Sequence, residues 1–181
     1  MNLALFVAGA VLAAPASATE PEVAAPPQPF YELDPSNSES QQYEAARARA
    51  LAWLAVAGNS ADASLAALAG GAAAQLSAAH FLVAADAAAD QRCASIRASF
   101  FVLDTSPGTI FVCADTRWHV LHEPDPVTDM LAQALVHEAA HLAGTADECA
   151  ATLLELEAAR SGDGRPNMGN VHRYAAQCEA F

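Results

Sequence analysis

Residues 137–147 read His137-Glu138-Ala139-Ala140-His141-Leu142-Ala143-Gly144-Thr145-Ala146-Asp147, and the expected fold is built around this stretch. Residues four apart lie on one face of a helix, so His137 and His141 can point at one metal ion. Glu138 lies beside the first histidine, where it can take a proton from a water molecule activated by the metal. This spacing predicts a Zn²⁺ site of the kind that zinc metallopeptidases use.

A zinc site that keeps one position open for water needs a third protein ligand. Asp147 is the nearest candidate, and Glu148 is the alternative. Thr145 and Glu148 also fit a capping box, S/T-x-x-E, which would occupy Glu148 with the amide of Thr145. The tight turn at Gly144 is expected to bring residue 147 back toward His141. We therefore predict Asp147 as the third metal ligand.

A competing interpretation is an alanine-rich buried helix that carries two histidines by chance. Burying two imidazoles and a carboxylate without partners is costly, which makes an apolar helix a poor place for an accidental set. The metal site is therefore the preferred interpretation of His137 and His141.

Capping signals delimit the helix that carries the motif. Asp125 is a good N-cap and proline suits the first helical position, so a helix is predicted from Pro126 to about Ala143, with Gly144 as its stop. The next helix is predicted to begin at the capping box and run to about Arg160. A last helix is predicted from about Asn167 to Ala180.

Upstream segments complete the predicted fold. Helices are predicted over residues 38–58, 61–69 and from 72 to about 80, separated by turn residues that include Gly70-Gly71, whereas Phe81 to Asp90 is ambiguous. Residues 97–104 and 109–113 are predicted strands that form a β-hairpin around the turn 105–108, directly upstream of the HExxH helix. We expect an α+β, mostly α-helical, domain with this small hairpin and a central HExxH helix.

The hairpin has two possible roles. It can line a substrate cleft and pair with an extended peptide, or it can simply cover the helical core. His119 and His122 follow it with HxxH spacing but without an acidic helper in register, so we predict surface or rim positions for them.

The N-terminus predicts export. Residues 1–18 have an apolar run and an Ala16-Ser17-Ala18 cleavage site, typical of a signal peptide, although the start lacks Lys or Arg. Residues 19–37 are rich in proline and are predicted to be a linker or a disordered N-terminus, followed by one domain over residues 38–181. We expect a secreted or periplasmic protein with no membrane span.

Four cysteines remain after the predicted cleavage. In an exported chain an even number suggests disulfides, and we favour Cys93–Cys113 and Cys149–Cys178 because each joins neighbouring elements. A four-cysteine zinc site is the alternative, but no CxxC pair supports it.

The net charge of −13 argues against binding to nucleic acid and to anionic membrane surfaces. It is compatible with basic peptide substrates and equally with solubility alone. The expected partner is therefore a peptide or protein substrate, and we expect a monomer.

The motif followed by Gly144-Thr145-Ala146-Asp147 resembles the aspzincin metallopeptidases, the deuterolysin and peptidyl-Lys metalloendopeptidase group. The segment from Thr109 to Trp118 and the Asn170 to Tyr174 segment resemble further parts of that family. The resemblance implies a zincin-like fold, zinc bound by His137, His141 and Asp147, and Glu138 as general base. The family places a tyrosine three residues after the aspartate, where this chain has Ala150. Tyr174 or His172 could replace that donor, and we name Tyr174 as a candidate catalytic residue.

The spacing His-Glu-x-x-His-x-x-Gly-x-x-Asp is also similar to the snapalysin-like metzincins, for which Met168 would supply the Met-turn. The helix predicted directly after Asp147 argues against this family. Both resemblances imply the same ligands, base and cofactor, Zn²⁺. The alternatives to an active endopeptidase are a catalytically degenerate zinc- or peptide-binding relative, a cell-wall peptide hydrolase, and an exported helical protein with structural histidines.

Overall fold

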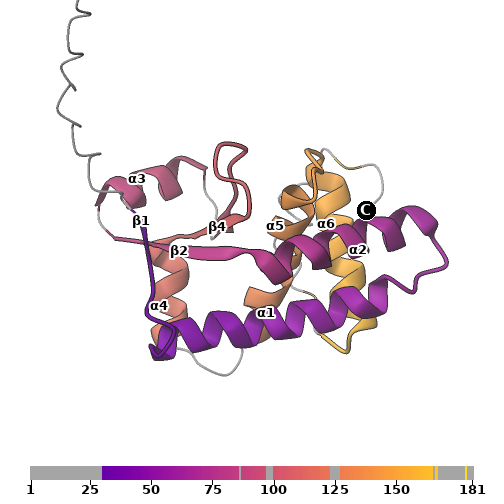
Figure 1. The fold of residues 1–181 in the computed structure, drawn as a ribbon, viewed down its shortest axis with the longest axis horizontal. Helices are drawn as coiled ribbons and strands as arrows, with labels where there is room; N and C mark the ends of the chain where they lie inside the picture. Colours follow the sequence, from indigo (N-terminus) through magenta and orange to yellow (C-terminus); the bar gives the residue numbers. More distant parts are fainter. Residues whose placement is uncertain are drawn as a thin grey trace, which may run out of the picture.

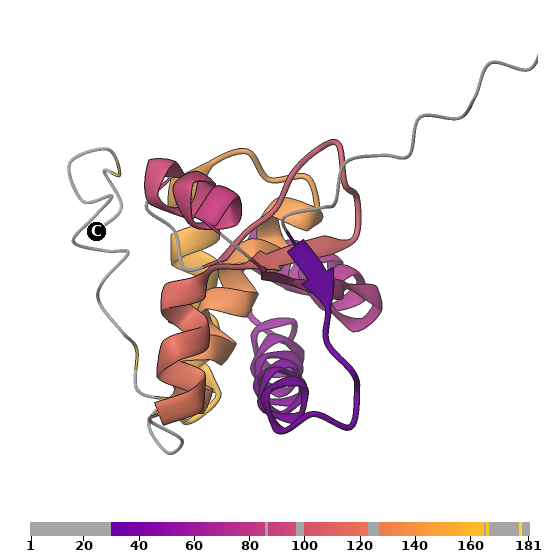
Figure 2. The same cartoon turned by 90° about the vertical axis from the view of Figure 1, so that its left-hand side faces the viewer.

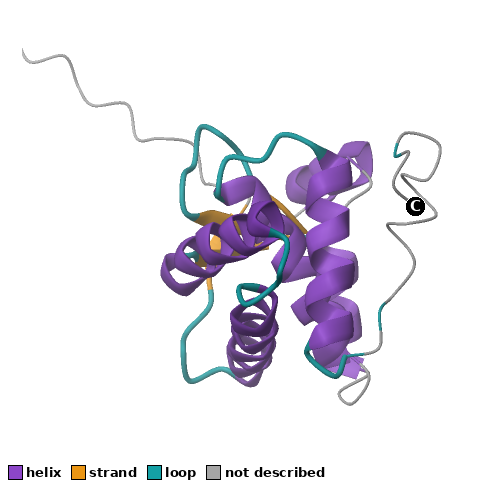
Figure 3. Cartoon of the chain, turned by 90° about the vertical axis from the view of Figure 1, so that its right-hand side faces the viewer, coloured by secondary structure: helices purple, strands orange, loops and turns teal. Residues whose placement is uncertain are grey.

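The computed structural model describes residues 30–85, 87–96, 100–122, 127–164, 166 and 178. The elements, in chain order, are β1 (Phe30–Glu32), α1 (Ser38–Ala57), α2 (Ala63–Ala78), β2 (His80–Ala84), α3 (Ala87–Ile96), β3 (Phe100–Phe101), β4 (Thr109–Val112), α4 (Ala114–His122), α5 (Val127–Leu142) and α6 (Glu148–Ser161). The chain is α+β and mostly helical, as predicted (Figure 3).

A four-stranded sheet has the order β1-β2-β4-β3. The antiparallel β3–β4 pair is the predicted hairpin, although β3 contains only two residues. β2 pairs in parallel with β4, and β1 pairs antiparallel with β2. β1 lies inside the segment predicted as a linker, because Phe30 is buried against the rings of Phe101 and Phe111. The folded region therefore begins by Phe30 rather than at Ser38.

The two faces of the sheet are covered by different helices. Strand side chains alternate, so Ile110 and Val112 of β4 join the main core, whereas Phe111 and Cys113 join a smaller second core. The second core includes residues of α3, which lies on one side of the sheet, with α1 and α4 on the other (Figure 2). The predicted Cys93–Cys113 disulfide is confirmed and ties α3 to the end of β4.

α5 is the central helix of the main core. It packs against α1, α2 and α6, and α1 and α2 lie along each other beside it (Figure 1). Its residues Leu135, Val136, Ala139 and Ala140 are fully buried. The predicted helix is confirmed from Val127 to Leu142, and its predicted start at Asp125-Pro126 lies outside the described residues.

Two predictions about the connecting segments are wrong. α2 continues through Gly70-Gly71, because the surrounding alanines favour helix and a Cβ on Gly71 would lie 3.4 Å from Ala143 Cβ. Small residues here let α2 approach the end of α5 closely. In addition, α4 separates the hairpin from α5, so the hairpin is not directly upstream of the motif helix.

A partly buried ion pair joins the first turn of α1 to α4. Arg117 donates to both oxygens of Glu39, at 2.6 and 2.9 Å, and to the carbonyl oxygen of Ala84 at the end of β2. Glu39 is 2% exposed, and the hydroxyl of Tyr43 also donates to it. These bonds fix the sheet relative to α1 and thus relative to α5. In the described part of the chain, no helix has the length and apolar character needed to cross a membrane.

Gly162 provides the first test of this packing. A Cβ at this position would overlap the buried indole of Trp53, so Gly162→Ala is expected to lower the free energy of unfolding by about 1–3 kcal/mol. Gly70→Ala is the matched control: it meets no atom within 4 Å and should stabilise α2 by up to about 1 kcal/mol. Chemical denaturation measures both changes, and an unchanged stability of Gly162→Ala would contradict the packing.

Candidate metal centre

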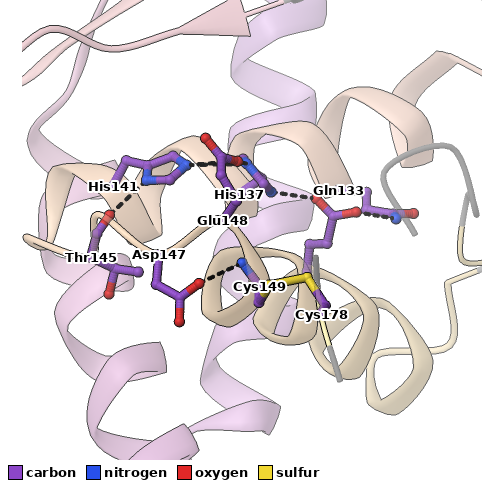
Figure 4. A network of polar contacts seen from close by, with 9 residues as sticks. Gln133, His137, His141, Thr145, Asp147, Glu148, Cys149 and Cys178 are labelled. Carbon is purple, nitrogen blue, oxygen red and sulfur yellow. Dashed lines mark hydrogen bonds and ion pairs between the residues drawn. A yellow bond between two sulfur atoms is a disulfide. The ribbon is translucent and has the colours of Figure 1, made fainter. Parts of the chain in front are cut away.

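His137 and His141 lie one turn apart on the face of α5 that meets α6 (Figure 4). Their Nε2 atoms are 3.1 Å apart. Oε2 of Glu148, the first residue of α6, lies 3.0 Å from His137 Nε2 and 3.5 Å from His141 Nε2. The three side chains thus form a group that could hold a metal ion.

The spacing of these three atoms matches a small tetrahedral site. With metal–ligand distances of about 2.0–2.1 Å, neighbouring ligand atoms of a tetrahedral zinc site lie about 3.3–3.4 Å apart. The observed separations of 3.0, 3.1 and 3.5 Å fall on both sides of that value. An ion would therefore fit with only small adjustments of the side chains.

The outer nitrogens of both rings face acceptors. His141 Nδ1 lies 2.6 Å from the carbonyl oxygen of Thr145, which can only accept, so this nitrogen carries the hydrogen. His137 Nδ1 lies 2.9 Å from Oε2 of Glu155, a carboxylate that is 1% exposed. In their neutral forms both rings therefore direct the Nε2 lone pair inward, toward the other ring and Glu148.

The two Nε2 lone pairs and the Glu148 oxygen lie close together, an arrangement that a positive charge between them would stabilise. Two lone pairs and a carboxylate oxygen repel one another unless a proton or a metal ion lies between them. Burial alone would lower the pKa of His137, but its hydrogen bond to the Glu155 carboxylate and the charges of Glu138, Glu155 and Glu148 raise it overall. The same negative field favours a metal cation.

The centre is closed on one side and accessible on the other. The side chain of His137 is 6% exposed, that of His141 15% and that of Glu148 42%. Glu148 is therefore the most exposed of the three side chains, and it marks the side from which water would approach the group. Glu138 follows His137 in α5 and is half-buried.

The turn after α5 explains how Glu148 reaches the histidines. Thr145 N donates to Ala140 O at 3.1 Å, and Gly144 N donates to His141 O at 2.9 Å, which is the Schellman pattern. Gly144 has φ +96°, a left-handed conformation that glycine adopts without strain. The predicted stop at Gly144 is confirmed, and the same turn presents the Thr145 carbonyl to His141.

The predicted capping box is wrong. α6 begins at Glu148, and its N-cap is Asp147, whose Oδ1 accepts from Cys149 N at 2.8 Å. A capping box would start the helix two residues earlier, with Thr145 as N-cap. Aspartate is a better N-cap than threonine, because its short carboxylate accepts hydrogen bonds from the free amides of the first turn. The carboxylate of Asp147 turns toward Cys149, whereas that of Glu148 lies with the imidazoles (Figure 4).

The structure thus brings together His137, His141 and Glu148, and it places Asp147 in a capping role. The confirmed disulfide between Cys149 and Cys178 holds the first turn of α6 to the C-terminal part of the chain. Tyr174, the predicted last helix other than Cys178, and Met168 lie outside the described residues. His119 and His122 lie in α4, but their side chains are not described.

The sequence did not predict two further residues beside His137, Gln133 and Glu155. Gln133 donates to Glu155 Oε1 at 3.1 Å, and both side chains are almost completely buried. The signals were available: Gln133 precedes His137 by one helical turn, and Glu155 follows Glu148 by two. A glutamate between two leucines of a buried helix face also indicates a partner.

The arrangement has three potential ligand atoms, a partly exposed Glu148 and a carboxylate, Glu138, next to His137 in the chain. Such a set can bind a divalent metal ion and polarise a small molecule that enters from solvent. The chain matches no protein-family model, no curated protein sequence and no solved structure, so its function has to be inferred from this group of side chains.

Proposed function

We propose that the chain is an exported zinc-dependent metalloendopeptidase in which His137, His141 and Glu148 hold the metal. One observation carries the proposal: two Nε2 atoms and a carboxylate oxygen converge at 3.0–3.5 Å, while both Nδ1 atoms face acceptors. Two imidazoles with one carboxylate suit zinc better than magnesium or calcium, which prefer oxygen ligands. Glu148 replaces Asp147 as the proposed third ligand.

Zinc in this site would supply a Lewis acid that polarises the peptide carbonyl and lowers the pKa of water. Glu138 accepts a proton from the attacking water and passes it to the nitrogen of the leaving amine. Water thus adds across the C–N bond, and no side chain becomes acylated. The two disulfides support an oxidising compartment, in agreement with the predicted signal peptide.

The substrate class is peptide or protein, and the net charge of −13 favours basic substrates. The aspzincin resemblance remains a prediction, and the proposal does not depend on it, because a glutamate ligand on the next helix is not the aspartate ligand of that family's motif. Ala150, at the position of the family tyrosine, keeps a catalytically degenerate zinc-binding relative as the second candidate.

The test is the metal content and activity of the purified protein. Elemental analysis should find one zinc per chain, and His137→Ala should remove it. His80→Ala, which changes an exposed histidine of β2, should keep it. Hydrolysis of a mixed peptide library should stop with a chelator and return with Zn²⁺.

The other outcomes separate the alternatives. Zinc without hydrolysis identifies the degenerate relative, and release of muropeptides without cleavage of ordinary peptides identifies a cell-wall hydrolase. Absence of any bound metal after loading would leave the histidines with a structural role and would overturn the proposal.

A further inference from the structure

Glu155 is a carboxylate at a position that packing alone would fill with an apolar residue. It is 1% exposed and lies between Leu154 and Leu156, which are also buried. An ionised carboxylate costs several kcal/mol to bury unless charged or hydrogen-bonding groups compensate for it. Its place in the core therefore has to be explained by its partners.

Those partners lie on α5, one turn apart. Gln133 Nε2 donates to Glu155 Oε1 at 3.1 Å, and His137 Nδ1 lies 2.9 Å from Oε2. Gln133 is 3% exposed, so the whole chain of contacts is excluded from water. The amide fixes the orientation of the carboxylate, and the carboxylate faces the outer nitrogen of the ring.

Two carboxylates of one helix face enclose the ring of His137. Glu148 and Glu155 are seven residues apart, two turns of α6, and so share a face. Glu148 lies 3.0 Å from Nε2, and Glu155 lies 2.9 Å from Nδ1. A flip of the ring would break both contacts, so α6 determines the orientation of His137.

We infer that Glu155, held by Gln133, is a positioning residue for the metal ligand His137. It keeps the hydrogen on Nδ1 and directs the Nε2 lone pair at the ion. This inference rests on the metal site of the proposed function. The carboxylates of Glu148 and Glu155 also balance the two positive charges of a divalent ion, and metal binding makes Nδ1–H a stronger donor to Glu155.

Zinc affinity and the histidine tautomer test this role. Glu155→Gln keeps an acceptor of the same shape without the charge and is expected to weaken zinc binding about 10-fold. Glu155→Leu removes the acceptor and should weaken it by up to about 100-fold. Competition with a chelator measures both values, and ring ¹⁵N NMR of the metal-free proteins reports the tautomer. His137 should carry its hydrogen on Nδ1 in the wild type and Glu155→Gln, and should show a mixture in Glu155→Leu.

Glu157→Gln is the matched control on the same helix. Its side chain is 43% exposed and pairs with Arg160 at the surface, so zinc affinity should not change. Circular dichroism verifies that each variant is folded; a leucine in place of a buried charge is compatible with folding.

The outcomes are distinct. If Glu155→Leu binds zinc as tightly as the wild type with the same tautomer, Glu155 only fills space and the inference is overturned. If the wild type binds no zinc, the proposed function fails, whereas the tautomer still decides the role of Glu155: a change in Glu155→Leu supports positioning of His137, and no change overturns it.

Discussion

Replacing Glu138 with glutamine is expected to lower kcat on peptide substrates by about 10²–10⁴-fold, the range that a general base contributes, while the bound zinc remains. Glutamine has nearly the same shape but no basic oxygen, so it can still hydrogen-bond water and cannot accept its proton. Glu138 is half-buried, next to fully buried Ala139 and Ala140, so the substitution leaves the core of α5 unchanged.

Elemental analysis and steady-state kinetics on the same preparation separate chemistry from metal binding. Glu44→Gln is the control, because Glu44 lies at the surface of α1 and pairs with Arg47 in the next turn. A Glu138→Gln protein that retains wild-type kcat would disprove the proposed base, whether or not the metal site exists.

The elements that the sequence predicted well have local signals. α5 carries the His-Glu-x-x-His spacing and ends at a glycine with φ +96°, and four cysteines allow only three ways of forming two disulfides. The parallel pairing of β2 with β4 has no such signal. It links residues about 30 positions apart, from Phe81 to Ile110, and its register depends on which faces the helices cover.

The first two proposed ligands follow from spacing on one helix, whereas the third depends on where the next helix begins. A capping box would begin the helix with Thr145 as N-cap, but the structure begins it two residues later with Asp147 as N-cap. This shift exchanges the roles of two adjacent carboxylates. Cap choice rests on differences of about 1 kcal/mol, so composition and spacing could not decide it.

Comparing Glu148→Ala with Asp147→Ala tests whether Glu148 is the third ligand and Asp147 only the N-cap of α6. Glu148→Ala removes a ligand atom that lies 3.0 Å from His137 Nε2, and it should weaken zinc binding by more than the roughly 100-fold that outer hydrogen-bond partners reach. Asp147→Ala removes the N-cap of α6 and should lower the stability of the metal-free protein by about 1 kcal/mol.

The two variants are therefore expected to affect different measurements. Chelator competition should place Glu148→Ala far below the wild type and Asp147→Ala close to it. Denaturation of the metal-free proteins should show the loss of the N-cap in Asp147→Ala, an effect that does not depend on metal. The opposite pattern, with zinc lost only in Asp147→Ala, would return the third ligand to the residue that the sequence predicts. The Asp147 carboxylate would then have to turn from the amide of Cys149 toward the imidazoles when metal binds.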